Sequence, residues 1–203
     1  MNLRPRDVLG LAFHDHEVAC ALLDSRGRLR KAGRFRASDG LTVQKAGEFG
    51  AALKAYLHEQ GLDGTSTAVA GVPARWLMAE PREVPPADSA TQLAGLRLAA
   101  ERVSLGDDTR LIFDVAGSPP AKGGSAMLVG LATKRVEQIT KICEAAGLKV
   151  AGITATGLAV AAALPAGNDR TVVLFDGDGA EIIGGSQAGI RSSELGPKPL
   201  HCR

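Results

Sequence analysis

The sequence predicts a mixed α/β (α+β) protein, and three patterns in its 203 residues support this fold class. Stretches that alternate apolar and polar residues, typical of half-buried strands, occur near the N-terminus and again near the C-terminus. Between them, segments with apolar residues at helical spacing alternate with short apolar stretches that suit buried strands. Turns rich in Gly, Pro and Asp separate the segments. A chain of this length can bury a core as one domain or as two small ones.

The first elements follow a characteristic order. Val8–Phe13, Glu17–Leu23 and Arg28–Arg36 alternate as strands joined by short polar turns, which predicts an antiparallel meander. A helix is expected over Thr42–His58, and Thr67–Val72 is a short apolar strand that suits a buried, parallel position. Three hairpin strands, a helix and then a parallel strand are typical of the start of an actin-like (ribonuclease H-like) lobe.

After a junction at Pro73, the pattern predicts a small α+β unit. Arg75–Val84 is extended but interrupted by Pro81, so it fits an edge strand, because proline cannot donate to a sheet ladder. Asp88 is a suitable N-cap for the helix that follows. Arg110–Val115 then alternates as a strand and leads into a hairpin loop rich in Gly and Pro.

The next stretch leads back to the first lobe. It comprises an apolar strand at Ala126–Ala132, a helix ending near Ala146, a strand at Leu148–Ile153 and a small-residue helix at Thr156–Leu164. Gly147 is expected to be the C-cap of the longer helix, since glycine adopts the left-handed conformation at low cost.

These patterns predict three parts. The first is residues 1–73 with 154–168, the second an inserted α+β subdomain at residues 74–153, and the third residues 169–203. The family resemblance given below implies that the first is an actin-like lobe and the third the start of a second lobe that is incomplete or degenerate. The expected strands of the second lobe form a further meander, at Thr171–Asp176, Glu181–Gly185 and Ile190–Leu195.

The composition is that of a soluble globular protein and argues against several functional classes. Hydrophobic residues make up 45% and charged residues 23%, which argues against global disorder. The net charge of +2 and the aromatic content of 3% favour neither a nucleic-acid partner nor base stacking. The longest nearly apolar run, Leu158–Leu164, is too short to span a bilayer. We therefore expect a cytoplasmic protein that reaches a membrane only through a partner.

The three cysteines predict neither a disulfide framework nor a metal site. Cys20 falls in an expected strand, Cys143 on the apolar face of a helix and Cys202 near the C-terminus, and no C-x-x-C spacing occurs. Buried free thiols behave as small hydrophobic groups, and a reducing compartment is the default for such a pattern.

The His-Asp-His-Glu turn after the first strand raises the question of a metal site. His14 and His16 share one face, and Glu17 is adjacent. Zinc sites usually need three or four protein ligands, and the other histidines, His58 and His201, have no sequence tie to this turn. A solvated polar turn is the favoured interpretation.

Two other candidate motifs have simple explanations. Lys122-Gly-Gly124 is not a phosphate-binding loop, since its glycine spacing and its strand–helix context are wrong. Trp76, the only tryptophan, is expected to pack between subdomains rather than to act as a binding hot spot.

Several short strings resemble the PilM family of type IV pilus assembly proteins, together with the related GspL cytoplasmic domain of type II secretion and the division protein FtsA. The strings are Val69-Ala-Gly-Val-Pro73, Val84-Pro-Pro86, Glu101-Arg102, Phe113-Asp114, Met127 to Ala132, Lys134-Arg-Val-Glu137, Ala145-Ala-Gly-Leu-Lys149, Ile153-Thr-Ala-Thr-Gly-Leu-Ala159 and Val172-Val-Leu-Phe-Asp176. The resemblance rests on their order and spacing, which cover nearly the whole chain.

The resemblance implies an actin-like lobe with an inserted subdomain and the start of a second lobe. It also implies ATP bound between the lobes and recruitment of the cytoplasmic segment of an inner-membrane partner. Two β-hairpins hold the phosphates in such proteins, with glycine and serine where backbone amides approach closely.

The first hairpin departs from the family pattern. PilM-like sequences resemble Gly-Ile-Asp-Ile-Gly-Ser-Ser-Ser-Val-Lys here, whereas residues 10–19 of this chain are Gly-Leu-Ala-Phe-His-Asp-His-Glu-Val-Ala. Ala12 stands in place of the metal-organising Asp, His14 in place of a glycine and Ala19 in place of the Lys. These losses remove most of the means of holding Mg²⁺-ATP. Asp15 could replace the carboxylate only if the turn were remodelled.

The second hairpin is nearer to the pattern. Asp176, Gly177, Asp178 and Gly179 resemble the Asp-x-Gly start of the second phosphate loop, although Asp178 occupies the expected glycine position. A plain type I′ hairpin turn is the favoured alternative, because Asp and Gly suit its backbone. Weak binding of Mg²⁺-ATP by these residues stays open, and no other cofactor is expected.

The favoured function is a non-catalytic cytoplasmic scaffold or adaptor of a type IV pilus or type II secretion-like assembly, which binds the cytoplasmic segment of an inner-membrane protein. The alternative is a working actin-like ATPase or small-molecule kinase with an atypical first phosphate loop. A third alternative is an α/β interaction domain unrelated to actin-like proteins. Ala12, His14 and Ala19 favour the first, and self-association stays open.

Overall fold

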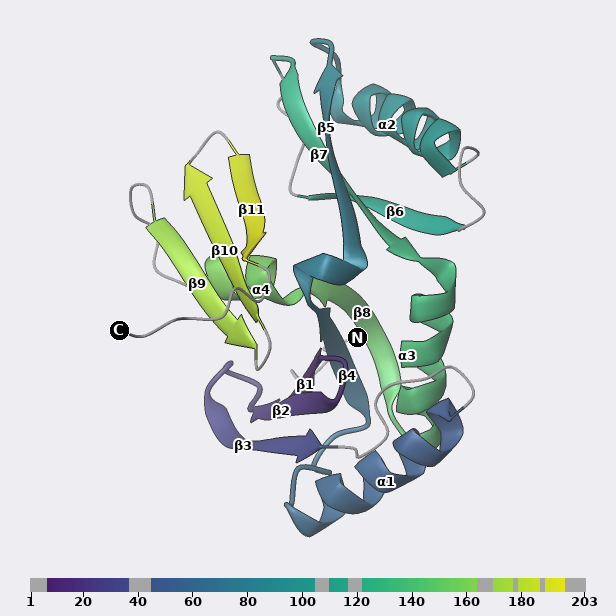
Figure 1. Ribbon diagram of the computed structural model, residues 1–203, viewed down its shortest axis with the longest axis vertical. Helices are drawn as coiled ribbons and strands as arrows, with labels where there is room; N and C mark the ends of the chain where they lie inside the picture. Colours follow the sequence, from purple (N-terminus) through teal and green to yellow (C-terminus); the bar gives the residue numbers. More distant parts are fainter. Residues whose placement is uncertain are drawn as a thin grey trace, which may run out of the picture. The chain divides into compact units, whose positions relative to one another are not determined.

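The computed structural model describes residues 7–36, 45–104, 110–116, 122–163, 170–176, 179–186 and 189–195. The chain forms two compact units, whose elements Figure 1 labels. One unit comprises residues 1–73 and 134–159, and the other comprises residues 74–133 and 160–203. The chain therefore leaves the first unit after Pro73 and returns to it at Lys134.

A five-stranded sheet is the framework of the first unit. Its strands are β1 (Val8–Phe13), β2 (Glu17–Leu23), β3 (Leu29–Arg36), β4 (Thr67–Val72) and β8 (Lys149–Ala155), in the order β3-β2-β1-β4-β8. β2 pairs antiparallel with β1 and with β3, whereas β4 pairs parallel with β1 and with β8. The predicted meander and the predicted parallel strand are confirmed.

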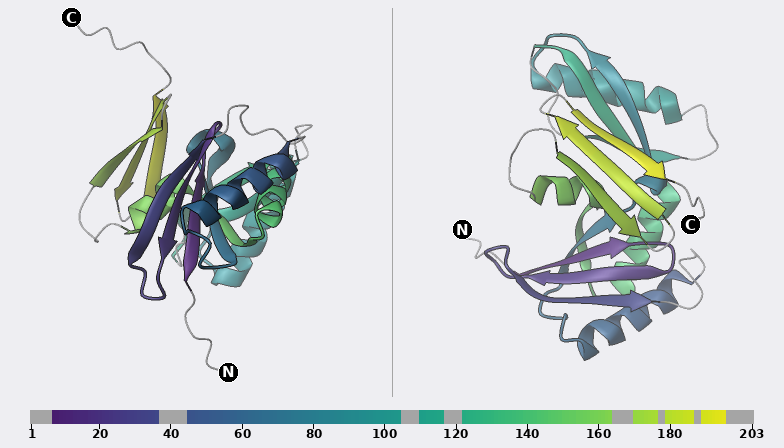
Figure 2. Two further views of the ribbon diagram at one scale, coloured as in Figure 1. Left: turned by 90° about the horizontal axis from the view of Figure 1, so that it is seen from below. Right: turned by 60° about the vertical axis from the view of Figure 1, so that its left-hand side comes forward.

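Two helices, α1 (Ala46–Glu59) and α3 (Thr133–Ala145), lie on the same side of this sheet (Figure 2). Every second residue of β1 and β4 is buried, as the period of a strand requires. The largest fully buried side chains of this unit are Leu9, Leu11, Phe13, Val18, Leu53, Leu57, Leu62, Gln138, Ile139 and Ile142. The expected start of the first helix at Thr42 lies outside the described residues.

Both helices end at a glycine of positive φ. After α3, the N–H of Gly147 (φ +78°) donates to the carbonyl of Glu144, and the N–H of Leu148 donates to the carbonyl of Cys143. This pair of bonds is a Schellman motif, which confirms the predicted C-cap. The same motif ends α1 at Gly61 (φ +58°).

A three-stranded antiparallel sheet and one helix form the subdomain in the second unit. Its strands are β5 (Leu77–Val84), β6 (Leu111–Ala116) and β7 (Gly124–Ala132), in the order β5-β7-β6, and its helix is α2 (Ser89–Ser104). Their buried core consists of Val84, Leu96, Ala100, Ala126 and Leu128. β5 lies at the edge of this sheet, which confirms the prediction made from its proline.

Asp88 caps the N-terminus of α2, as predicted. Its Oδ1 accepts hydrogen bonds from the backbone N–H groups of Ala90 and Thr91, each at 3.0 Å, and its Oδ2 accepts one from the Thr91 hydroxyl at 2.6 Å. The hydrogen bond from the Thr91 side chain is the main cause that lowers the pKa of Asp88.

The C-terminal part of the second unit also contains a hairpin meander, as predicted. Helix α4 (Thr156–Ala163) precedes strands β9 (Arg170–Asp176), β10 (Gly179–Ser186) and β11 (Gly189–Leu195), which pair antiparallel in the order β11-β10-β9. No helix among the described residues is long and apolar enough to cross a membrane.

The structure corrects one part of the predicted domain division. The strand predicted at Leu148–Ile153 was assigned to the inserted subdomain, but as β8 it pairs parallel with β4 in the sheet of the first unit. Period-two alternation identifies a strand but not its neighbour, and a helix before a strand is the usual crossover to a parallel partner. The insertion therefore ends with β7, before α3. The assignment of residues 169–203 to a second lobe stays a prediction.

Candidate functional site

The carboxyl ends of three parallel strands meet at one edge of the sheet of the first unit. The register aligns Ala12 of β1 with Gly71 of β4, and Gly71 with Thr154 of β8. In open α/β sheets, ligands bind outside the carboxyl ends of the strands. These three residues, which we call the strand-end row, therefore mark the candidate functional site.

The β1–β2 hairpin beside the strand-end row is tight and regular. Antiparallel pairing continues to the end of β1, and the N–H of His14 donates to the carbonyl of Glu17 at 2.8 Å. Because His14 and Glu17 already pair, only two residues form the turn, and Asp15 lies at its tip. The turn is not remodelled to replace the carboxylate that Ala12 lacks.

A buried hydroxyl lies against the strand-end row. A Cβ atom on Gly71 would lie 2.7 Å from Oγ1 of Thr156 and 3.6 Å from Cα of Ala12. Glycine at position 71 thus makes the room that the Thr156 side chain occupies. The Thr156 hydroxyl is buried and has no hydrogen-bond partner among the residues that the structure describes, which is costly for a polar group. This threonine was not singled out from the sequence, where only its position at the start of a helix was visible.

The strand-end row does not fit a Mg²⁺ ion. Magnesium is bound by carboxylates together with phosphate and water oxygens. Ala12, Gly71 and Thr154 supply no carboxylate, and the neighbouring Thr156 supplies only a hydroxyl. Among the described residues, no group of three or more His, Cys, Asp and Glu side chains is placed to hold a metal ion. The His-Asp-His-Glu turn belongs to these described residues.

The structure places the second predicted hairpin only in part. Asp176 and Gly179 face each other at the ends of β9 and β10, so two residues connect the strands. A connection of two residues has the length that a type I′ turn requires. Gly177 and Asp178 themselves lie outside the described residues, as do His201 and Cys202. Nucleotide binding by Asp176, Gly177, Asp178 and Gly179 stays a prediction.

The remaining residues named from the sequence have structural positions. Cys20 and Cys143 are free and buried, and burial raises the pKa of each thiol to about 12, so neither is a reactive thiolate. Gly124 begins strand β7 rather than a helix, which confirms that Lys122-Gly-Gly124 is not a phosphate-binding loop. Trp76 is half-buried at the end of the 3₁₀ turn Ala74–Trp76.

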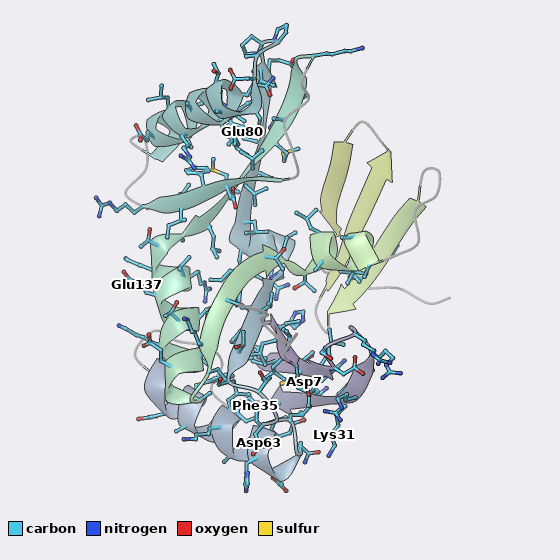
Figure 3. All side chains as sticks on the ribbon, turned by 180° about the vertical axis from the view of Figure 1, so that it is seen from behind. Asp7, Lys31, Phe35, Asp63, Glu80 and Glu137 are labelled. Atoms are coloured by element: carbon cyan, nitrogen blue, oxygen red, sulfur yellow. The ribbon has the colours of Figure 1, made fainter. Side chains whose placement is uncertain are left out.

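A pocket of about 350 Å³ lies in the second unit beside α2. It is lined by Arg82, Gly95, Leu98 and Ala99. The guanidinium of Arg82 forms an ion pair with Glu80 at 2.7 Å. Glu80 is labelled in Figure 3. The sequence patterns did not indicate this pocket, because strand and helix contribute to it from separate segments.

The order of the five strands, with a subdomain inserted between β4 and α3, defines the class of protein: the chain has the actin-like ATPase fold. This excludes the third alternative, an unrelated α/β domain. No protein-family model matches the chain, and no curated protein matches it in sequence.

Solved structures share the fold at low sequence identity. A chain of the PilM–PilN type IV pilus biogenesis complex matches with a TM-score of 0.72 and 14% identity, over 93% of this chain and 61% of that one. The cytoplasmic domain of EpsL, an inner-membrane component of the type II secretion system of Vibrio cholerae, matches with a TM-score of 0.62 and 14% identity, over 93% and 71%.

A third match has no known function. It is a protein of Bacteroides thetaiotaomicron with an actin-like ATPase fold, with a TM-score of 0.53 and 8% identity, over 96% of this chain and 71% of that one. The present chain thus spans less than two thirds of the PilM–PilN complex chain and somewhat more of the other two. At these identities the likeness establishes the fold alone.

Proposed function

We propose that this chain is a non-catalytic cytoplasmic scaffold or adaptor of a type IV pilus or type II secretion-like assembly. It would bind the cytoplasmic segment of an inner-membrane protein. The observation that carries the proposal is the strand-end row, where the five-stranded sheet presents Ala12, Gly71 and Thr154 and no carboxylate. Without a carboxylate at the strand-end row to hold Mg²⁺, this site is suited to presenting a surface rather than to turnover.

The likeness to known structures supports the choice of assembly. Two of the structures that share this fold are a pilus biogenesis complex and the cytoplasmic domain of an inner-membrane secretion component. By analogy, the partner of this chain is a membrane protein with a short cytoplasmic segment.

Two features favour the second candidate, an actin-like ATP-binding protein. The buried Thr156 hydroxyl beside Gly71 is a polar group that a bound phosphate or its hydration shell could satisfy. The Asp176 and Gly179 hairpin, which resembles a second phosphate loop, points the same way. The Thr156 hydroxyl comes with neither a carboxylate nor a cation, and the hairpin supplies the Asp176 carboxylate but no cation that would strengthen binding.

Co-expression tests the scaffold function. The chain is expressed with the cytoplasmic segments of the inner-membrane proteins encoded beside its own gene, and complexes are isolated and their stoichiometry measured. The proposal expects a stable complex with one pilus- or secretion-type segment, together with no ATP hydrolysis by the complex. Hydrolysis above the background of protein-free buffer would establish the second candidate, and failure of every such segment to bind would refute the first.

A further inference from the structure

Strand β3 forms an open edge of the five-stranded sheet. It is eight residues long, contains no proline and pairs on one side only, with β2. Among the described residues, no strand pairs with its outer side. Such an edge exposes a row of N–H and C=O groups that another extended chain can bond to.

The hydrogen bond that closes the first hairpin shows which groups point outward. His14 and Glu17 form a hydrogen-bonded pair, and such pairs alternate along an antiparallel ladder. On β2, Glu17 and every second residue after it therefore bond to β1, and Val18, Cys20 and Leu22 bond to β3.

The outward groups of β3 follow from its register with β2. Val18 faces Phe35 and Cys20 faces Gly33, so these two residues of β3 use their backbone groups in the ladder. Ala32, Arg34 and Arg36 alternate with them and direct their N–H groups to the open edge. Ala32 is exposed, so a partner strand can reach it.

The two faces of β3 differ in character. On the side of α1, Phe35, labelled in Figure 3, packs edge-on against Phe49 with ring centroids 5.2 Å apart. It also contacts Tyr56. Lys31 extends toward Gly61 on the same side. The alternation therefore places Arg34 and Arg36 on the opposite side of the sheet.

Carboxylates hold the arginines of β3 in place without covering them. Nη1 of Arg34 lies 3.4 Å from Oε1 of Glu17, and Nε of Arg36 lies 3.1 Å from Oε2 of the same carboxylate. Arg30 pairs with Asp7 at 2.8 Å. The side chains of Arg30, Arg34 and Arg36 remain 59%, 60% and 74% exposed. Each guanidinium has five N–H donors, so donors remain for a further anion.

The charge of the edge selects among partners. A second copy pairing with the same edge would bring arginines against arginines, and like charges opposite each other are destabilising. An acidic segment would instead find its carboxylates beside fixed cations. In the sheet of β5, β6 and β7, the edge strand β5 contains Pro81, and proline has no backbone N–H to donate.

We propose that the outer edge of β3 binds an extended acidic segment of a partner protein, which adds to the sheet as a further strand, with Arg30, Arg34 and Arg36 as charge partners. The proposal stands whether or not the chain serves a pilus or secretion assembly.

The test uses a fluorescent octapeptide, in which Glu alternates with Val and Thr, and measures its anisotropy with the purified chain. We expect saturable binding that weakens at ~0.5 M salt, and no binding of the same peptide with Lys in place of Glu. Ala32→Pro, which removes one outward N–H and no ladder bond, should weaken binding at least about tenfold. The matched control, Ala32→Val, keeps the N–H and should bind within about twofold of the wild type.

Three results would overturn the proposal. The first is that the chain does not bind the acidic peptide, and the second is that Ala32→Pro binds it as tightly as the wild type. The third is that the chain binds vesicles with anionic phospholipid but not the peptide. Equal binding by Ala32→Pro, with loss in Arg34→Gln/Arg36→Gln, would define a cationic patch without strand addition. If Ala32→Pro does not fold, hydrogen exchange of the wild type decides. The peptide must then protect the amides of Ala32, Arg34 and Arg36, and unchanged exchange refutes strand addition.

Discussion

Two regions of the five-stranded sheet differ in how well they suit an actin-like protein. One is the side packed against α1 and α3, and the other is the carboxyl end of the strands. On the packed side, β1, α1 and α3 each contribute fully buried side chains, such as Leu11, Leu53 and Ile142. At the carboxyl end, the strand-end row supplies no carboxylate, and the Thr156 hydroxyl has no hydrogen-bond partner within the described part of the chain. The folding of the sheet does not depend on the chemistry that such a fold often supports. Packing uses one side of the strands, whereas metal binding would use their carboxyl ends.

Two glycines of α1 differ in the space around them, and substituting them should give the largest expected effect on stability. A Cβ on Gly50 would press against the carbonyl oxygen of Ile142 and lie 2.6 Å from Cβ of Ala145, whereas a Cβ on Gly47 would meet nothing within 4 Å. Gly50→Ala should therefore lower the free energy of unfolding by ~2 kcal/mol. Gly47→Ala should raise it by ~1 kcal/mol, because alanine is the better helix former.

Urea unfolding of the two variants beside the wild type measures this difference. Equal stabilisation by both alanines would show that α1 and α3 do not approach each other at Gly50.

The carboxyl end is tested by removing its orphaned hydroxyl. Thr156→Val keeps the shape of the side chain and should leave stability unchanged or raise it by ~1 kcal/mol, since no hydrogen bond is lost. Thr140→Val is the matched control, because the Thr140 hydroxyl donates to the carbonyl of Val136 at 2.8 Å, and it should cost ~0.5–1 kcal/mol. Thermal unfolding compares the two. A loss of stability in Thr156→Val larger than in Thr140→Val would reveal a partner for the Thr156 hydroxyl.

The smallest expected effect concerns the helix cap of the second unit. The pKa of Asp88 is lowered from its ordinary value of 3.8, mainly by the hydrogen bond from the Thr91 side chain. A carboxyl group with a depressed folded pKa stabilises the fold above its unfolded pKa, and this contribution is lost as the pH falls through the folded value. Asp88→Ala should therefore lower Tm at neutral pH, and its Tm should converge with that of the wild type as the pH falls below 3.8.

Melting curves across that range check the cap. A difference in Tm that stays constant down to the lowest pH would contradict a role for the ionised carboxylate.

Local features of this fold could be predicted from the sequence because local chemistry determines them. The N-cap at Asp88, the C-cap at Gly147 and the edge position of β5 each follow from one residue type and its backbone requirements. The meander at the N-terminus follows from period-two alternation and short turns.

Long-range features could not be predicted in the same way. The neighbour of β8 depends on which strand has an open parallel edge, a property of the assembled sheet. The approach of Thr156 to Gly71 joins the start of a helix to a strand far away in the sequence. The arginines of β3 were visible as charges, but their common edge became evident only from the strand order.

Titration of the purified chain with Mg²⁺-ATP, followed by thermal unfolding, tests the central claim most directly. A ligand that binds only the folded state at about 100 times its Kd stabilises that state by ~2.7 kcal/mol, so binding would raise Tm visibly. Because the strand-end row lacks a carboxylate, we expect no saturable rise in Tm with Mg²⁺-ATP beyond that seen with Mg²⁺ alone. A saturable rise that is abolished by Asp176→Ala would contradict the account and show that the chain is a working nucleotide-binding protein.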